Sequence, residues 1–252
     1  MKQLLSGQNI IKSYGVGEEK HRVLNGVSVT IGSGEFVSIM GPSGSGKSTL
    51  LYALSGLDGI DGGEVSFEGR KLSGLSDNAL SDLRRSRMGF VFQQPALLKN
   101  LNLLDNIMLP QMRDRRRNVR QLNQKARDLM EQMGIGDLAE RDITQASGGQ
   151  LQRAGICRAL MSEPEIVFGD EPTGALNTKM AKEIMELFTK INRDGIAILL
   201  VTHDPNIAAR TERVLFLCDG EIVDECRLSK FTERDFDNRV GEITKRMQKI
   251  GI

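Results

Sequence analysis

The chain has 252 residues, with 34 basic and 33 acidic side chains and a formal net charge of +1. This balance excludes a bulk electrostatic attraction to nucleic acid or to an anionic membrane surface. No stretch approaches the length of an apolar membrane span, and the apolar run near Met1 is too short for a secretory signal, so we expect a cytosolic chain. The three cysteines form no C-x-x-C pair and are expected to be reduced thiols.

The first part of the chain, residues 2–36, is predicted to be rich in β-strand. Residues 4–14 and 23–31 are short runs with partial alternation of apolar and polar side chains, as expected of strands with one buried face. Tyr14 ends the first run. Its ring could stack on a flat base such as adenine, or it could be a half-buried surface tyrosine, and both interpretations stay open at this point.

Residues 41–49 fit the pattern G-x-x-x-x-G-K-[S/T] of a phosphate-binding loop. The loop lies between an apolar run expected to be a buried strand, residues 36–40, and an apolar run expected to begin a helix, residues 49–54. Its glycines let successive backbone N–H groups point at phosphate oxygens, and the helix N-terminus adds positive partial charge. Lys47 is predicted to reach the β- and γ-phosphates, and Ser48 to place its hydroxyl on Mg²⁺. A plain glycine-rich turn would not require the lysine and the hydroxyl at these offsets. The predicted nucleotide-binding residues here are Gly41, Ser43, Gly44, Ser45, Gly46, Lys47, Ser48 and Thr49.

A cluster of turn residues at 58–63 precedes a short strand predicted at 64–67. A helix is expected at 76–87 and a further strand at 88–92. Gln93 follows this strand directly. Because ligands in open α/β sheets lie outside the carboxyl ends of strands, Gln93 is a candidate site residue.

Residues 97–160 lack strong strand signals and are predicted to form a helical subdomain inserted into the α/β domain. Its first apolar run, residues 101–109, has mixed spacing and ends at Pro110. The basic stretch 113–120 is interpreted as a solvated helix face or an anion site, and the absence of interleaved aromatic residues argues against nucleic acid. Residues 119–134 carry apolar side chains at helical spacing and are expected to pack in the core.

Ser147, Gly148 and Gly149 precede an apparent helix that continues through Leu160. This segment, with Gln150, could be a second anion-binding helix N-terminus, or a plain turn and helix cap.

An apolar strand predicted at 165–170 delivers two adjacent carboxylates to its C-terminal end. Asp170 can hold Mg²⁺, and Glu171 can orient and deprotonate an attacking water. The alternative is a turn with two solvated acids. His203, one of two histidines, ends another buried strand, 197–202, and is a candidate contact to the γ-phosphate.

The remaining elements are predicted from their spacing. A helix is expected from Thr173 to Arg193. Residues 214–217 and 221–223, joined by a turn containing Asp-Gly, are expected to form a β-hairpin. Residues 229–252 read as a polar, partly amphipathic helical tail.

Together these elements resemble the ATP-binding cassette (ABC) family of transport ATPases, over roughly residues 3–228. The resemblance implies an α/β fold with a P-loop NTPase (RecA-like) core, an antiparallel β subdomain and an inserted α-helical subdomain. It implies an ABC ATPase domain at 2–228 and a C-terminal helical tail at 229–252. Within the domain, the core with its β subdomain would occupy about 2–92 and 160–228, and the helical subdomain about 94–159.

The resemblance also implies residue roles. Tyr14 matches the aromatic residue that stacks on adenine, and Gln93 matches the glutamine that contacts Mg²⁺ and the reaction water. Ser147, Gly148, Gly149 and Gln150 match the family signature, which contacts the nucleotide. Asp170 and Glu171 match the Walker B aspartate and the catalytic glutamate, and His203 matches the switch histidine. The implied catalytic residues are Gln93, Glu171 and His203, the implied Mg²⁺ ligands are Ser48, Gln93 and Asp170, and the implied cofactors are ATP and Mg²⁺.

Two positions depart from the family pattern. Ala146 stands where the signature usually opens with leucine. Asn177 stands where the D-loop usually ends in aspartate, so this position keeps a hydrogen-bonding side chain but loses the charge.

The resemblance implies a head-to-tail homodimer and an integral-membrane permease as partners, with a sensor kinase as a further candidate and no nucleic acid. It implies a cytoplasmic location, peripheral on the inner face of the cell membrane. Residues 14–18, 34–36, 56–58, 83–85 and 89–93 look like the lipoprotein-releasing and macrolide-exporter branch. Residues 171–177 look more like its bacitracin-resistance relatives, whose permeases handle antimicrobial peptides.

Two other classes of protein are less consistent with the sequence. ABC proteins of translation carry two cassettes, and those of DNA repair carry a long coiled coil, whereas this chain shows one set of motifs and no heptad arm. A nucleotide-dependent binding subunit with little turnover is the other alternative, and the presence of Glu171 and His203 argues against it.

Overall fold

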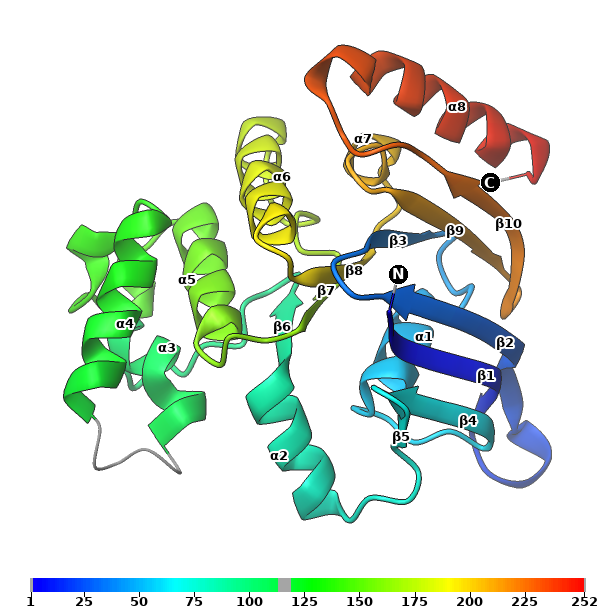
Figure 1. Cartoon of the computed structure of the whole chain (residues 1–252), viewed down its shortest axis with the longest axis horizontal. Helices are drawn as coiled ribbons and strands as arrows, with labels where there is room; N and C mark the ends of the chain where they lie inside the picture. Colours follow the sequence, from blue (N-terminus) through cyan, green and yellow to red (C-terminus); the bar gives the residue numbers. More distant parts are fainter. Residues whose placement is uncertain (1, 113–118, 252) are drawn as a thin grey trace.

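The computed structural model describes residues 2–112 and 119–251, and a six-stranded sheet forms its centre (Figure 1). The strand order is β10-β9-β3-β8-β7-β6, and all neighbouring pairs are parallel except β9 and β10. β3 and β8 are buried along their whole length, because continuous apolar runs suit a sheet covered on both faces. The strand bounds are β3 (Phe36–Met40), β6 (Met88–Phe92), β7 (Ile166–Asp170), β8 (Ala197–Val201), β9 (Arg213–Cys218) and β10 (Glu221–Arg227).

A second sheet is antiparallel, with the order β2-β1-β4-β5. Helix α1 (Lys47–Ser55) packs between the two sheets and contacts strands of both. One apolar core cluster therefore joins the antiparallel sheet, α1 and the strands β3, β7 and β8. The bounds are β1 (Gln3–Tyr14), β2 (His21–Gly32), β4 (Gly62–Phe67) and β5 (Arg70–Lys71).

The predicted helical insertion between two strands is confirmed. Between β6 and β7 lie α3 (Leu103–Met112), α4 (Val119–Gln132) and α5 (Gly148–Leu160), which pack on one another at one side of the molecule (Figure 1). The apolar stripe predicted on 119–134 lies in their core. Together with the two sheets, this confirms the predicted α/β class with an antiparallel β subdomain and an inserted α-helical subdomain.

α3 includes Pro110, at which the apolar run of residues 101–109 ends, and continues to Met112. One predicted boundary is wrong. α6 (Thr178–Arg193) begins five residues later than expected, because Pro172 and its neighbours form consecutive turns and Asn177 provides the N-cap. Most of the basic stretch 113–120 lies outside the described residues.

The other helices are α2 (Asp77–Arg87), α7 (Pro205–Ala208) and α8 (Phe236–Lys249), and the helix expected in the tail is thus confirmed over α8. α8 packs against α7 and the sheet near β9 and β10, where Ile243 is fully buried. The guanidinium of Arg239, 4% exposed, donates hydrogen bonds to three backbone carbonyls around this contact.

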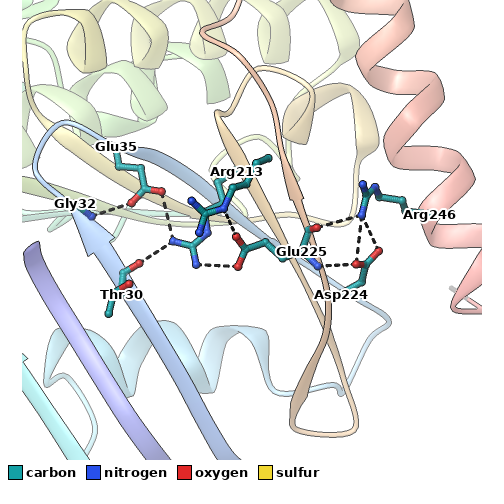
Figure 2. A network of polar contacts seen from close by, with 8 residues as sticks. Thr30, Gly32, Glu35, Arg213, Asp224, Glu225 and Arg246 are labelled. Atoms are coloured by element: carbon teal, nitrogen blue, oxygen red, sulfur yellow. Dashed lines mark hydrogen bonds and ion pairs between the residues drawn. The ribbon is translucent and has the colours of Figure 1, made fainter. Parts of the chain in front are cut away.

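A polar network ties the two sheets and α8 together (Figure 2). Arg213 of β9 donates to the carbonyl oxygen of Thr30 in β2 at 2.8 Å and pairs with Glu225 of β10 at 2.9 Å. Arg246 of α8 pairs with Asp224 of β10 at 3.1 Å. No helix among residues 2–112 and 119–251 is long and apolar enough to cross a membrane.

Candidate nucleotide-binding site

The predicted phosphate-binding loop connects β3 to α1. Gly44 and Gly46 have φ of +82° and +98°, a left-handed conformation that glycine adopts without steric cost. The first helical hydrogen bond of α1 runs from Leu50 to Gly46, so the preceding N–H groups of the helix have no intrahelical acceptor. Residues 42–44 are exposed. The loop therefore offers free backbone donors on an open face, which suits a phosphate chain.

The loop is braced from behind by the β9–β10 hairpin. A Cβ at Gly41 would overlap the carbonyl oxygen of Leu217 in β9. Gly220, in the hairpin turn, donates its N–H to the carbonyl oxygen of Ser45 at 3.2 Å and accepts from the N–H of Asn25 in β2 at 2.9 Å. The predicted hairpin is thus confirmed, and it holds the loop against β2.

Lys47 opens α1, and its ammonium folds back over the loop. Nζ donates to the carbonyl oxygen of Pro42 at 2.8 Å. Burial lowers the pKa of Lys47, and the negative charges of Glu171 and Asp170 offset part of this decrease. The lysine and the two acids predicted to serve ATP hydrolysis therefore share one electrostatic neighbourhood.

Asp170, the last residue of β7, receives two hydroxyl hydrogen bonds from α1. Ser48 Oγ donates to Oδ1 at 2.7 Å, and Tyr52 OH donates to Oδ2 at 2.6 Å. Hydroxyl and carboxylate oxygens are the ligands that Mg²⁺ prefers. Among the described residues no group of three or more His, Cys, Asp and Glu could hold a metal ion. Mg²⁺ in nucleotide sites typically binds through one or two carboxylates together with substrate phosphates.

Glu171 and His203 lie side by side at the ends of β7 and β8. Glu171 Oε1 is 3.3 Å from His203 Nδ1. The backbone of Glu171 has φ of +46° and donates its N–H to the carbonyl oxygen of Val201 in β8. A cavity of about 470 Å³ opens beside both side chains. The lining of this cavity combines both side chains with residues of α6 and α7.

Gln93 reaches the same place from the end of β6. The side chains of Gln93 and Glu171 both lie against Gly174. A Cβ added at Gly174 would be 2.9 Å from Gln93 Nε2 and 3.3 Å from Glu171 Oε2. Gln93, Asp170, Glu171 and His203 thus gather at the carboxyl edge of neighbouring parallel strands, as expected for a ligand site of this fold.

Tyr14 ends β1 and lies near the phosphate loop. Burial and Asp58 raise the pKa of Tyr14, and the nearby Thr49 side chain offsets part of this increase. The hydroxyl donates to Asp58 Oδ2 at 2.6 Å, and Lys12 Nζ lies 4.9 Å from the ring centroid. The ring is 44% exposed, which leaves surface for contact with a base.

Residues 147–150 lie apart from this group. Ser147 and Gln150 form a capping box at the start of α5, with the Gln150 side chain accepting from the Ser147 N–H at 2.8 Å. α5 belongs to the helical region and is well separated from α1 (Figure 1). The fold therefore does not bring these predicted nucleotide contacts to the chain's own phosphate loop.

The departure at Asn177 has a simple structural outcome. Its Oδ1 accepts from the N–H of Met180 at 2.9 Å and caps α6, a role that aspartate also fills well. Ala146 packs against the apolar core of the helical region.

Three residues at the site escaped the sequence analysis: Tyr52, Asp58 and Lys12. Lys12 Nζ pairs with the carboxylate of Asp58 at 2.7 Å and so holds in place the carboxylate that accepts from the Tyr14 hydroxyl. Tyr52 follows Ser48 by four residues on a predicted helix, so both project from one face. That spacing was a usable signal.

Comparisons with known proteins identify the family of this chain. A family model described as "ABC transporter" matches residues 24–174. The lipoprotein-releasing system ATP-binding protein LolD of Anaeromyxobacter dehalogenans is 44% identical, over 87% of this chain and 91% of that protein. The macrolide export ATP-binding/permease protein MacB of Chlorobaculum tepidum is 42% identical over 86% of this chain, which spans only 33% of that relative's length. A dimeric structure of the ATP-binding cassette MJ0796 in a post-hydrolysis state, bound to ADP and Pi, has a TM-score of 0.79 and 40% identity, over 90% of this chain and 100% of that one. The chain therefore belongs to the ABC transporter family, as an ATP-binding, ATP-hydrolysing cassette with the P-loop NTPase fold.

Proposed function

We propose that the chain powers a membrane permease by closing with a second copy of itself around ATP. The observation that carries this proposal is the convergence of Lys47, Asp170, Glu171 and His203 beside an open phosphate loop. In this proposal residues 2–228 form the ATPase domain and residues 229–252 a helical tail.

The site residues have distinct tasks in this proposal. The loop N–H groups and Lys47 hold the phosphates, and Tyr14 contacts adenine. Ser48, Asp170 and Gln93 hold Mg²⁺, which when bound neutralises the negative charge of the phosphates. Glu171 accepts the proton of the attacking water, and His203, 3.3 Å away, orients the Glu171 carboxylate.

The second copy supplies the contacts that one chain cannot. Because residues 147–150 lie away from the chain's own loop, Ser147 and Gly149 would meet ATP bound by a partner copy. A twofold arrangement gives two such sites, each shared between copies. The MJ0796 cassette, whose structure is dimeric, supports a dimer of this chain. Hydrolysis would then release the dimer, because the γ-phosphate no longer bridges donors of both copies.

The relatives support a membrane partner. One is named as part of a lipoprotein-releasing system and another as a combined ATP-binding and permease protein. We therefore place this chain on the inner face of the cell membrane, bound to the cytoplasmic helices of a permease near Gln93. A sensor kinase in the same complex stays an untested prediction.

For the substrate we propose antimicrobial peptides of the bacitracin type, because residues 171–177 look like those of bacitracin-resistance transporters. The second candidate is lipoprotein release or macrolide efflux. It is favoured by identities of 44% and 42% to relatives with those names.

The test is co-purification of a tagged Glu171→Gln chain with ATP from detergent-solubilised membranes of the native cell. Lys47→Ala, which should bind ATP poorly, is the matched control. Mass spectrometry should identify a polytopic protein enriched with Glu171→Gln over Lys47→Ala, and deletion of that protein should reduce resistance to bacitracin. A macrolide or lipoprotein phenotype would favour the second candidate. Recovery with ribosomes or DNA alone would contradict a transport role.

A further inference from the structure

The carboxylate of Asp170 is held from two sides by one helix. Ser48 Oγ donates to Oδ1 and Tyr52 OH to Oδ2, at 2.7 and 2.6 Å. Ser48 and Tyr52 are four residues apart on α1, so their side chains leave the same face of the helix toward the end of β7. Of these two hydroxyl residues, only Ser48 belongs to the phosphate-loop motif.

The two bonds have different fates once a cation arrives. The terminal torsion of an aspartate is broad, so a carboxylate with one hydrogen bond can still rotate. A cation that takes Ser48 Oγ as a ligand competes with the bond between Ser48 and Asp170. The Tyr52 hydroxyl lies on the other oxygen and can keep its bond, so it is the contact that continues to fix the carboxylate plane.

Tyr52 is suited to act as a permanent donor. Its ring packs against the core between the two sheets, which fixes the direction of the hydroxyl. A phenol hydroxyl is protonated at neutral pH, and an ionised carboxylate can only accept a hydrogen bond, so Tyr52 is the donor in this contact.

We propose that Tyr52 is a positioning residue of the divalent-cation site, holding the Asp170 carboxylate in the orientation that receives the Mg²⁺ accompanying ATP. The inference rests on the proposed function of Ser48 and Asp170. It adds that Tyr52, a hydrogen-bond partner of the metal ligand Asp170 that lies outside the phosphate-loop motif, sets the affinity for the cation. Removal of such a partner typically weakens metal binding by roughly 10–100-fold.

The first experiment compares Tyr52→Phe with the unmodified chain. Each is saturated with a non-hydrolysable ATP analogue and titrated with Mn²⁺, with free Mn²⁺ measured by electron paramagnetic resonance. We expect Mn²⁺ binding to weaken about 10-fold or more, while the affinity for the analogue without divalent cation is unchanged. The control Ser55→Ala removes another hydroxyl of α1, which donates to the carbonyl oxygen of Tyr52, and should leave Mn²⁺ binding unchanged.

Two results would overturn the proposal. One is Mn²⁺ binding by Tyr52→Phe within about twofold of the unmodified chain, well short of the loss expected for such a partner. The other is an equal loss of nucleotide affinity without the cation, which would make Tyr52 a packing residue. If the unmodified chain binds no nucleotide, the proposed function itself fails and the inference fails with it.

A second measurement applies even if Tyr52→Phe folds poorly. The chain has no tryptophan and only two tyrosines, so in a Tyr14→Phe background Tyr52 is the sole tyrosine emitter. A hydrogen bond to a carboxylate quenches tyrosine fluorescence. We expect Asp170→Ala to increase the emission of Tyr52 in this background. Unchanged emission would show that the contact is not made in solution and would overturn the proposal.

Discussion

Replacement of Glu171 by glutamine should stop hydrolysis and leave the site otherwise intact. Glutamine has the same length, can still hydrogen bond to His203 and leaves the backbone bond to Val201 unchanged. What disappears is the negative charge that accepts a proton. Loss of a general base costs roughly 10²–10⁴-fold in rate, or about 3–5 kcal/mol in activation free energy.

The assay is single-turnover hydrolysis of γ-labelled ATP at saturating Mg²⁺, with ATP affinity and dimer formation measured on the same samples. We expect ATP binding to persist, because one negative charge is removed from beside the phosphates. The ATP-bound dimer should accumulate. The control is Glu186→Gln, an exposed glutamate of α6, which should hydrolyse ATP at the unmodified rate.

Hydrolysis by Glu171→Gln at the unmodified rate would refute this reasoning. The substitution removes only the carboxylate charge, so an unchanged rate would mean that this carboxylate does not act as the general base. A joint loss of ATP binding and hydrolysis would refute it differently, by showing that the carboxylate shapes the site rather than accepting a proton.

Three further predictions concern stability. Glu171 has φ of +46°, so Glu171→Gly should relieve backbone strain that Glu171→Ala retains. Glycine loses more conformational entropy on folding, which offsets part of this gain and leaves a net difference of about 0.5–1 kcal/mol. In calorimetry the glycine variant should therefore unfold about 1–4 °C above the alanine variant. Arg239→Met removes three hydrogen bonds from a buried guanidinium to carbonyls and should lower the free energy of unfolding in urea by about 3–5 kcal/mol; a loss below about 1 kcal/mol would show that water replaces them. Burial and a hydrogen bond to Glu242 raise the pKa of Cys226 from 9.0 to about 11. Its contribution to stability is therefore complete below pH 9 and is lost as the pH rises toward 11, so stability should fall less steeply over this range in Cys226→Ala, and equal slopes would contradict this.

Much of the site could be predicted because each of its parts is local. The phosphate loop depends on glycines, a lysine and a hydroxyl at fixed offsets between an apolar strand and a helix. Asp170, Glu171 and His203 each follow an apolar run directly. In a parallel sheet the carboxyl ends of such runs meet at one edge, so their convergence follows from the fold class alone.

What could not be predicted depends on which strands are neighbours and in what register. The bond between Tyr52 and Asp170 joins residues of α1 and β7 that only the sheet order brings together. Similarly, the sequence identifies residues 58–63 only as a turn and does not show that Asp58 accepts a hydrogen bond from Tyr14. α6 starts late, at Thr178, because residues 171–176 form hydrogen-bonded turns instead of helix, although the sequence predicts a helix from Thr173.

The bracing of the phosphate loop by the β9–β10 hairpin affects how the chain matures during synthesis. The loop at 41–49 leaves the ribosome before residues 217–220, which contact the carbonyl oxygen of Ser45 and approach Gly41 closely. β3 likewise waits for β8 and β9, between which it lies in the sheet. Since a chain emerges N-terminus first, the nucleotide site is completed only after residues 217–220 have emerged. A nascent or shortened chain that lacks this hairpin therefore carries the phosphate-loop sequence without the contacts that brace it at Gly41 and Ser45.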